Sequence, residues 1–127
     1  MIGLTVDEVL RIHREVIVLF GGTHGVRDSN GLESAIHRPT SGFTGAEFYK
    51  TPAEKASAIM ESILNNHPFL DGNKRTGYIL MRLTLLHYGF DIEATQEEKY
   101  QFVVSVASGE KGYDQILKWI NSKMIRL

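Results

Sequence analysis

Apolar residues recur at spacings of three and four in several separate segments of the chain, a pattern that predicts helices. The first segment begins at Thr5-Val6-Asp7-Glu8, where Thr5 and Glu8 can each accept a hydrogen bond from the other's backbone N–H as a capping box. Its apolar stripe reaches Phe20, and Gly21-Gly22 follows as a stop signal. A helix over about residues 5–20 is therefore expected.

The same reasoning predicts five further helices. Thr51-Pro52-Ala53-Glu54 is a second capping box, with proline at the first helical position where its missing N–H costs nothing. Thr95 opens another helix in front of Glu97-Glu98. The expected segments are about Gly31 to His37 ending before Pro39, Pro52 to about Asn65, Asn73 to just before Gly89, Thr95 to before Gly109, and about Tyr113 to Lys123.

Residues Pro39 to Lys50 lack a helical period and contain two glycines, two phenylalanines and a tyrosine. This composition predicts an extended, glycine-hinged hairpin, or flap, with an ordinary surface loop as the alternative. No linker, repeat or low-complexity tract divides the chain. The sequence thus predicts one all-α domain over residues 1–127, with about six helices and a short β-hairpin.

Net charge, cysteine content and the length of apolar runs limit the partners and sites that the chain can have. The formal net charge of −1 argues against binding nucleic acid through an overall electrostatic field. The absence of cysteine excludes disulfides and thiolate zinc sites. No apolar run reaches the roughly 18 residues that a membrane span requires. A soluble cytoplasmic protein is expected.

The chemistry is concentrated in residues 65–82, NNHPFLDGNKRTGYILMR. A helix start leaves backbone N–H groups without intrahelical partners, and the macrodipole adds partial positive charge there. With a glycine and two cations at such a start, a phosphate-binding cradle is expected, formed by Gly72, Asn73, Lys74 and Arg75. Asp71 offers a hard oxygen ligand for Mg²⁺, and His67 is a candidate general base because its unperturbed pKa lies near neutrality.

The string HPFLDGNKR resembles the signature of the Fic/Doc family, His-x-Phe-x-Asp/Glu-Gly-Asn-x-Arg, with every fixed position present. Phe20-Gly21-Gly22, Gly25-Val26-Arg27-Asp28 and Gly31 to Pro39 resemble the upstream part of the death-on-curing (Doc) branch, and Asn73-Lys74-Arg75-Thr76 resembles its core motif. The resemblance implies a Fic/Doc-like helical domain with a flap that aligns a target segment by strand addition. It also implies an ATP- and Mg²⁺-dependent transferase acting on a protein hydroxyl.

Two reactions are open within this family. The Fic branch transfers AMP and typically has glycine after the asparagine and a second arginine three residues beyond the first, where this chain has Lys74 and Tyr78. Lysine is the residue of the Doc branch, which binds the nucleotide in the inverted sense and phosphorylates a threonine of elongation factor Tu. Gly72, by contrast, agrees with the Fic branch, since Doc has alanine there. Phosphorylation is preferred, with AMP transfer as the alternative.

Two further expectations concern regulation and activity. Some Fic proteins carry an inhibitory Ser/Thr-x-x-x-Glu-Gly/Asn helix, and no such string occurs in this sequence. The resemblance therefore implies that a toxin of this kind is restrained by a separate antitoxin protein. A catalytically silent binding module with the same fold is the hypothesis from another class, but His67, Asp71, Asn73 and Arg75 occurring together favours an active site.

Overall fold

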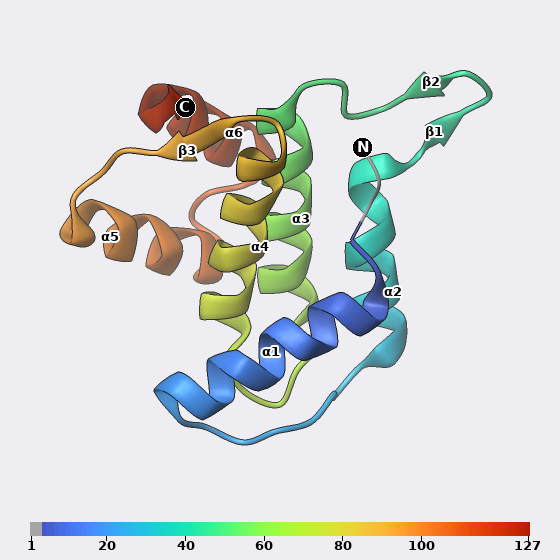
Figure 1. Ribbon diagram of the computed structural model, residues 1–127, viewed down its shortest axis with the longest axis vertical. Helices are drawn as coiled ribbons and strands as arrows, with labels where there is room; N and C mark the ends of the chain where they lie inside the picture. The colour runs from blue at the N-terminus through green and yellow to red at the C-terminus, as the bar shows by residue number, and fades with distance from the viewer. Residues whose placement is uncertain (1–3) are drawn as a thin grey trace.

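The computed structural model describes residues 4–127, and within them six α-helices enclose a single core. Two central antiparallel helices, α3 and α4, are flanked by α2 on one side and by α5 and α6 on the other, while α1 crosses near the loop that joins α3 to α4 (Figure 1). The elements are α1 Val6–Phe20, α2 Ser29–His37, the 3₁₀ helix η1 Arg38–Thr40, β1 Gly42–Phe43, β2 Ala46–Glu47, α3 Pro52–Asn66, α4 Asn73–His87, β3 Phe90–Ile92, α5 Gln96–Ala107, α6 Tyr113–Lys123 and β4 Met124–Arg126. The predicted all-α class is confirmed.

The capping residues account for where the helices begin. Thr5, Thr51 and Thr95 are the N-caps of α1, α3 and α5, and each forms the predicted capping box with the glutamate three residues later. α2 begins two residues earlier than expected because Asp28 caps it, its carboxylate accepting a bond from the Gly31 N–H at 2.9 Å. Pro39 does not end the helical conformation abruptly. The 3₁₀ helix η1 continues from α2 and holds Pro39 in its first turn, where the missing N–H is tolerated.

Gly77 sets the spacing of the central pair. A Cβ atom at this position would lie 2.1 Å from Cδ1 of Leu64, so the glycine lets α4 approach α3 more closely than any other residue would. The buried side chains around this contact include Ile63, Leu64, Leu80 and Met81. Because α3 and α4 form the centre of the core, their spacing fixes the position of the loop between them.

The predicted hairpin is confirmed, but it lies away from the α3–α4 loop. β1 and β2 pair antiparallel, with Phe43 opposite Ala46, and the hairpin projects from the end of the α3–α4 pair opposite to the loop (Figure 1). α3 has 15 residues and is about 22 Å long, so its first turn, which holds the hairpin, lies far from its last. The hairpin and the α3–α4 loop therefore lie at opposite ends of α3.

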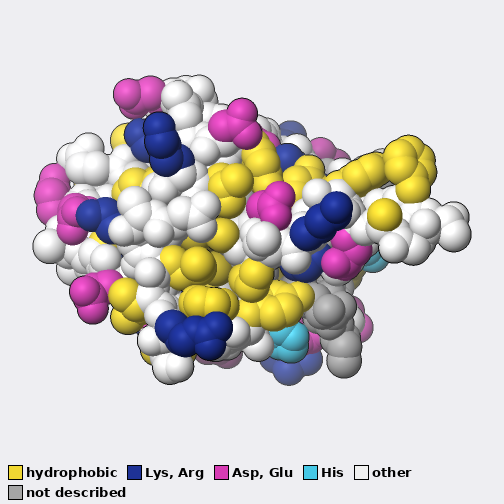
Figure 2. All heavy atoms as spheres, turned by 90° about the horizontal axis from the view of Figure 1, so that it is seen from above, with side chains coloured by type: hydrophobic (Ala, Val, Ile, Leu, Met, Phe, Trp, Pro, Cys, Tyr) yellow, Lys and Arg dark blue, Asp and Glu magenta, His cyan; other side chains and the backbone are white. Residues whose placement is uncertain are grey.

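Two cations hold the base of the hairpin. Lys55 is 2 % exposed and donates hydrogen bonds to Glu47 Oε2 at 2.9 Å and to the carbonyl oxygens of Pro39 and Tyr49. Arg38 donates to the Tyr49 hydroxyl at 2.8 Å and to Glu61. The tip is held by neither cation: Phe43 is 80 % exposed, and apolar side chains colour the projecting end in Figure 2.

A second small sheet was not predicted. β3 follows α4 and pairs antiparallel with β4 at the end of the described chain, with Asp91 opposite Ile125. Arg82 forms a bidentate ion pair with Asp91 at 2.8 and 2.9 Å, which lowers the pKa of the Asp91 carboxyl. α5 and α6 are tied by a hydrogen bond from Lys123 that lowers the pKa of Glu98 to about 2, and by the stacking of Phe102 on Trp119.

Among residues 4–127, none of the helices combines the length and the apolarity that crossing a lipid bilayer would require.

Gly77→Ala should lower the free energy of unfolding by about 2 kcal/mol, because the added methyl group overpacks the contact with Leu64. The adjacent buried residue provides a matched control. Within the described chain the Thr76 hydroxyl has no hydrogen-bond partner, so Thr76→Val should raise the free energy of unfolding by about 1 kcal/mol. Urea denaturation measures both, and a Gly77→Ala protein as stable as the parent would contradict the close approach.

Candidate active site

The end of α3 presents His67 to solvent. His67 is the C-cap of α3 and adopts a left-handed backbone conformation, with φ of 46°, which turns the chain out of the helix before Pro68. Arg27 fixes this turn from outside, since its guanidinium donates 2.7 Å hydrogen bonds to the carbonyl oxygens of both Asn66 and His67. The exposed imidazole is thereby carried on a rigid backbone.

The middle of the loop is held like an added strand. The N–H groups of Arg27 and Asp28 donate to the carbonyl oxygen of Pro68, and the Leu70 N–H donates to the carbonyl oxygen of Gly25. Phe69 is buried, and it anchors the loop in the core. The segment 25–28 and the loop therefore brace each other.

The Asn73 side chain belongs to this bracing. Its Oδ1 accepts from the Phe69 N–H and its Nδ2 donates to the Phe69 carbonyl oxygen, both at 3.0 Å. The amide therefore closes the loop onto the start of α4, and what Asn73 leaves free for an anion is its backbone N–H at the first helical position.

Asp71 is oriented by two backbone donors. Its Oδ2 accepts from the Thr23 N–H and its Oδ1 from the Gly72 N–H, each at 3.1 Å. A Cβ at Gly22 would lie 2.8 Å from Oδ2, so the glycine gives this carboxylate its space. The carboxylate is exposed and faces the same cleft as the start of α4.

The start of α4 is built to attract an anion. Gly72 precedes it at φ of 77°, a left-handed conformation that favours glycine, and within residues 4–127 no side chain caps the helix. The first turn contains Lys74 and Arg75 and no acidic residue. Cations at a helix N-terminus oppose the macrodipole, so this arrangement is unfavourable until negative charge is bound there.

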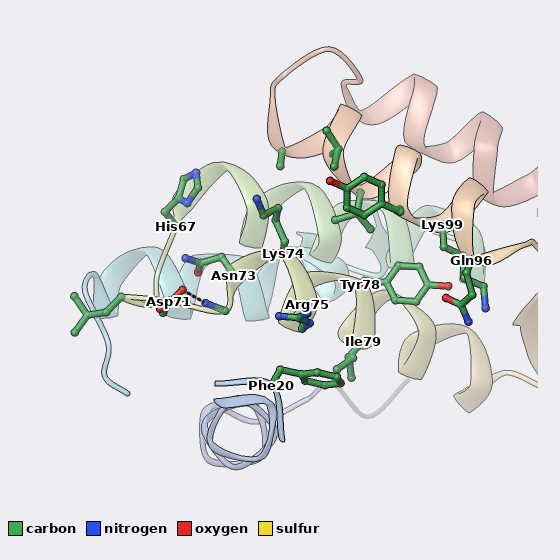
Figure 3. A pocket seen from close by; sticks show the side chains of 16 residues that line it. Phe20, His67, Asp71, Asn73, Lys74, Arg75, Tyr78, Ile79, Gln96 and Lys99 are labelled. Carbon is green, nitrogen blue, oxygen red and sulfur yellow. Dashed lines mark hydrogen bonds between the residues drawn. The ribbon is translucent and has the colours of Figure 1, made fainter. Parts of the chain in front are cut away.

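All six residues predicted for the site line one cleft of about 740 Å³ between the end of α1, the first half of α4 and α5 (Figure 3). They are His67, Asp71, Gly72, Asn73, Lys74 and Arg75. The Arg75 guanidinium lies 4.4 Å from the centre of the Phe20 ring, which forms the α1 side of the cleft. The two cations and the open helix end can bind a phosphate chain there, next to a carboxylate and an imidazole.

The cleft fits a Mg²⁺ ion that arrives with a phosphorylated substrate better than a metal ion held by protein ligands alone. Within the part of the chain that the structure describes, no three His, Cys, Asp or Glu side chains are grouped as metal ligands. A single carboxylate beside a phosphate cradle is the donor set that Mg²⁺ uses when it arrives with a phosphorylated substrate.

His13 supports the site, a role that was not predicted from the sequence. This α1 residue is 3 % exposed, stacks on the Phe69 ring at 3.8 Å between centroids, and its Nε2 lies 2.8 Å from the Asp71 carbonyl oxygen. Because a carbonyl oxygen only accepts, Nε2 must be the donor. The available signal in the sequence was a polar residue on the apolar stripe of the first helix, but this signal does not identify Asp71 as the partner.

The architecture and this site define the class of protein. The family model described as the Fic/DOC family matches residues 3–85, which is more than half of the chain, and the chain belongs to this family.

The chain is also similar to two individual proteins. The chain is 33% identical over 87 residues to the Toxin Doc of Mycolicibacterium smegmatis, covering 63% of this chain and 66% of the relative. It is 29% identical over 66 residues to a Fido domain-containing protein of Dictyostelium discoideum, covering 51% of this chain and 46% of the relative. The chain thus spans between about half and just under two thirds of the length of these relatives.

His13→Phe should loosen the loop without removing the stack on Phe69. The ring is kept but the donor to the Asp71 carbonyl oxygen is lost, which should lower the local opening free energy by about 1 kcal/mol. Backbone amides of residues 69–73 should then exchange hydrogen about fivefold faster. His13→Gln restores a donor and should recover slow exchange, so equally fast exchange in both variants would contradict the role of the hydrogen bond.

Proposed function

We propose that this protein is a toxin-like transferase that moves the γ-phosphoryl group of ATP, with Mg²⁺, to a serine, threonine or tyrosine hydroxyl of a target protein. The observation that carries the proposal is the uncapped, cationic start of α4 beside an exposed imidazole and an oriented carboxylate. Phosphoryl transfer requires mainly positioning and neutralisation of charge, which such a site can supply.

Each residue has a distinct task in this reaction. The backbone N–H groups at residues 72–75, with Lys74 and Arg75, bind the phosphates and offset their charge. Asp71 holds Mg²⁺, which when bound neutralises the charge that develops on the phosphate oxygens. His67 accepts the proton of the target hydroxyl. The hydroxyl oxygen bonds to the γ-phosphorus as the bond to the bridging oxygen breaks, and ADP leaves.

Lys74 supports phosphorylation over AMP transfer. It is the Doc-branch residue at this position, and Tyr78 stands where the Fic branch has its second arginine. AMP transfer remains the second candidate because Gly72 agrees with the Fic branch. The structure supplies a local reason for Gly72 that is independent of the nucleotide: a Cβ there would lie 3.1 Å from Cδ1 of Ile17 and 3.5 Å from His13 Nε2.

The proposal extends to partners. By analogy with the Doc branch, the target is a translation factor such as elongation factor Tu, and a separate antitoxin restrains the enzyme in the cytoplasm. The similarity to a Toxin Doc supports this assignment. The hairpin lies near the start of α3, and His67 caps the other end of that helix. The hairpin would therefore engage such a target as an added strand only if the bound segment reaches along α3 or the hairpin moves.

The position of a radiolabel tests the reaction directly. Protein incubated with its target or a cell lysate should transfer label from γ-labelled ATP and not from α-labelled ATP. His67→Ala should reduce this transfer by at least about a hundredfold, since a general base contributes on that scale. His87→Ala, which alters an exposed histidine at the other end of α4, should leave it unchanged. Transfer of the α label would show AMP transfer, and transfer of neither would favour a binding module.

Asp71→Asn tests the metal assignment. A neutral amide is a poorer ligand for a hard cation, so the Mg²⁺ concentration for half-maximal transfer should rise by about tenfold. The amide also keeps just one of the two backbone hydrogen bonds, so the melting temperature is recorded alongside. Reduced transfer with an unchanged Mg²⁺ requirement would mean that Asp71 acts by shaping the loop.

A further inference from the structure

His67 is held in a backbone conformation that residues with a side chain rarely adopt. Its φ of 46° lies in the left-handed region, and among residues 4–127 it is the one residue other than glycine with a positive φ. A β-carbon is strained in this region, and a helix that ends with such a turn usually uses glycine there. Strain of this kind persists only where surrounding contacts fix the backbone. The structure must therefore contain groups that hold His67 in place.

The Arg27 side chain binds the two peptide groups on either side of His67. Its Nε donates to the carbonyl oxygen of His67 and its Nη2 to that of Asn66, each at 2.7 Å. The Asn66 carbonyl belongs to the planar peptide group before the His67 Cα, and the His67 carbonyl belongs to the one after it. The relative orientation of these two planes is set by φ and ψ of His67. One rigid guanidinium group that binds both carbonyls therefore fixes this pair of angles.

The direction of the imidazole depends on these two backbone angles. A functional histidine is commonly oriented by a hydrogen bond from its second ring nitrogen to a carbonyl or a carboxylate. The His67 ring is exposed, and within the described residues neither of its nitrogens makes such a bond. What directs the ring is then the Cα–Cβ bond, whose direction follows from φ and ψ. Figure 3 shows His67 at one end of the cleft, near Asn73 and Lys74.

Arg27 is itself fixed by its backbone. Its N–H and that of Asp28 donate to the Pro68 carbonyl oxygen at 2.7 and 3.1 Å, and the Asp28 carboxylate caps α2. The last turn of α3 contains no basic residue, so Arg27 supplies from another segment the positive charge that favours a helix C-terminus. Because the backbone bonds do not involve the guanidinium group, the Arg27 side chain can be replaced without releasing the segment 25–28 from the loop.

We infer that Arg27 is a positioning residue for the transfer reaction: its guanidinium group fixes φ and ψ of His67 and so directs the imidazole at the start of α4. The inference deepens the proposed function and rests on it for the role of His67 as the base. Arg27 does not line the cleft, so its loss should misplace the base and leave the phosphate cradle intact. A misplaced base slows the chemical step and leaves nucleotide binding unchanged.

Arg27→Ala should therefore lower the rate of transfer and not the affinity for ATP. At saturating ATP, transfer of the γ label to the proteins of a cell lysate should fall by at least about tenfold. The ATP concentration for half-maximal transfer should change by less than about twofold. NMR gives a second readout, because the coupling between the amide and α protons of His67 depends on φ and should leave its parental value. Arg27→Lys keeps the charge but cannot hold both carbonyls in one plane, so both the rate and the coupling should be intermediate.

Arg14→Ala is the matched control, since this exposed arginine of α1 makes no side-chain hydrogen bond or ion pair among residues 4–127. It should leave the transfer rate and the His67 coupling unchanged. An Arg27→Ala protein with the parental rate would overturn the inference, as would slower transfer with an unchanged coupling, or a half-maximal ATP concentration that rises as much as the rate falls. The proposed function fails separately: if the parent protein transfers no label, the coupling in Arg27→Ala still decides whether Arg27 fixes His67.

Discussion

The α3–α4 loop keeps its shape through hydrogen bonds that reach it from outside, and the site depends on this external support. Arg27 holds the backbone at Asn66 and His67, residues 25–28 pair with residues 68–70, and His13 holds the carbonyl of Asp71. A loop of this length with left-handed residues at both ends, His67 and Gly72, would not hold one conformation unaided. The packing of α1 against α4 is therefore a condition for the geometry of the site.

This dependence also explains why the start of α4 can remain uncapped. Three other helices begin with a threonine whose hydroxyl accepts from a backbone N–H of the first turn. α4 forgoes that bond and places two cations where they oppose the dipole, which costs some helix stability. Burial of Phe69 and of the α4 core face offsets the cost, so the open helix end survives as a place for a ligand. Apolar packing elsewhere in this way supports an open, cationic helix end.

The sequence predicted the features that depend on neighbours along the chain. Capping boxes and glycine stops located the helices to within about two residues, and the composition of residues 39–50 indicated the hairpin. The six motif residues were expected together and do line one cleft, although whether they act as proposed is a question for experiment. Local patterns carry this information because helix ends and tight turns are decided within a few residues.

What the sequence did not predict depends on contacts between distant segments. β3 has three residues and pairs with β4, which follows more than thirty residues later, so neither shows a detectable alternation. His13 gains its role from Asp71, 58 residues away, and nothing near it in the chain indicates that. The position of the hairpin relative to His67 follows from the full length of α3, which the resemblance to the family did not specify. In each case tertiary packing, and not local propensity, decided the outcome.

Lys55 fixes the base of the hairpin, so the conformation of its turn matters little to the rest of the fold. Because one buried ammonium group and Arg38 hold both ends of the segment against α3, the residues at the turn contribute little to folding. Exposed turns of this kind tolerate insertion and exchange, and lengthening them costs little loop entropy. The tip around Thr44 and Gly45 is thus free to diverge in sequence and length without any compensating change in the residues that line the cleft at the start of α4.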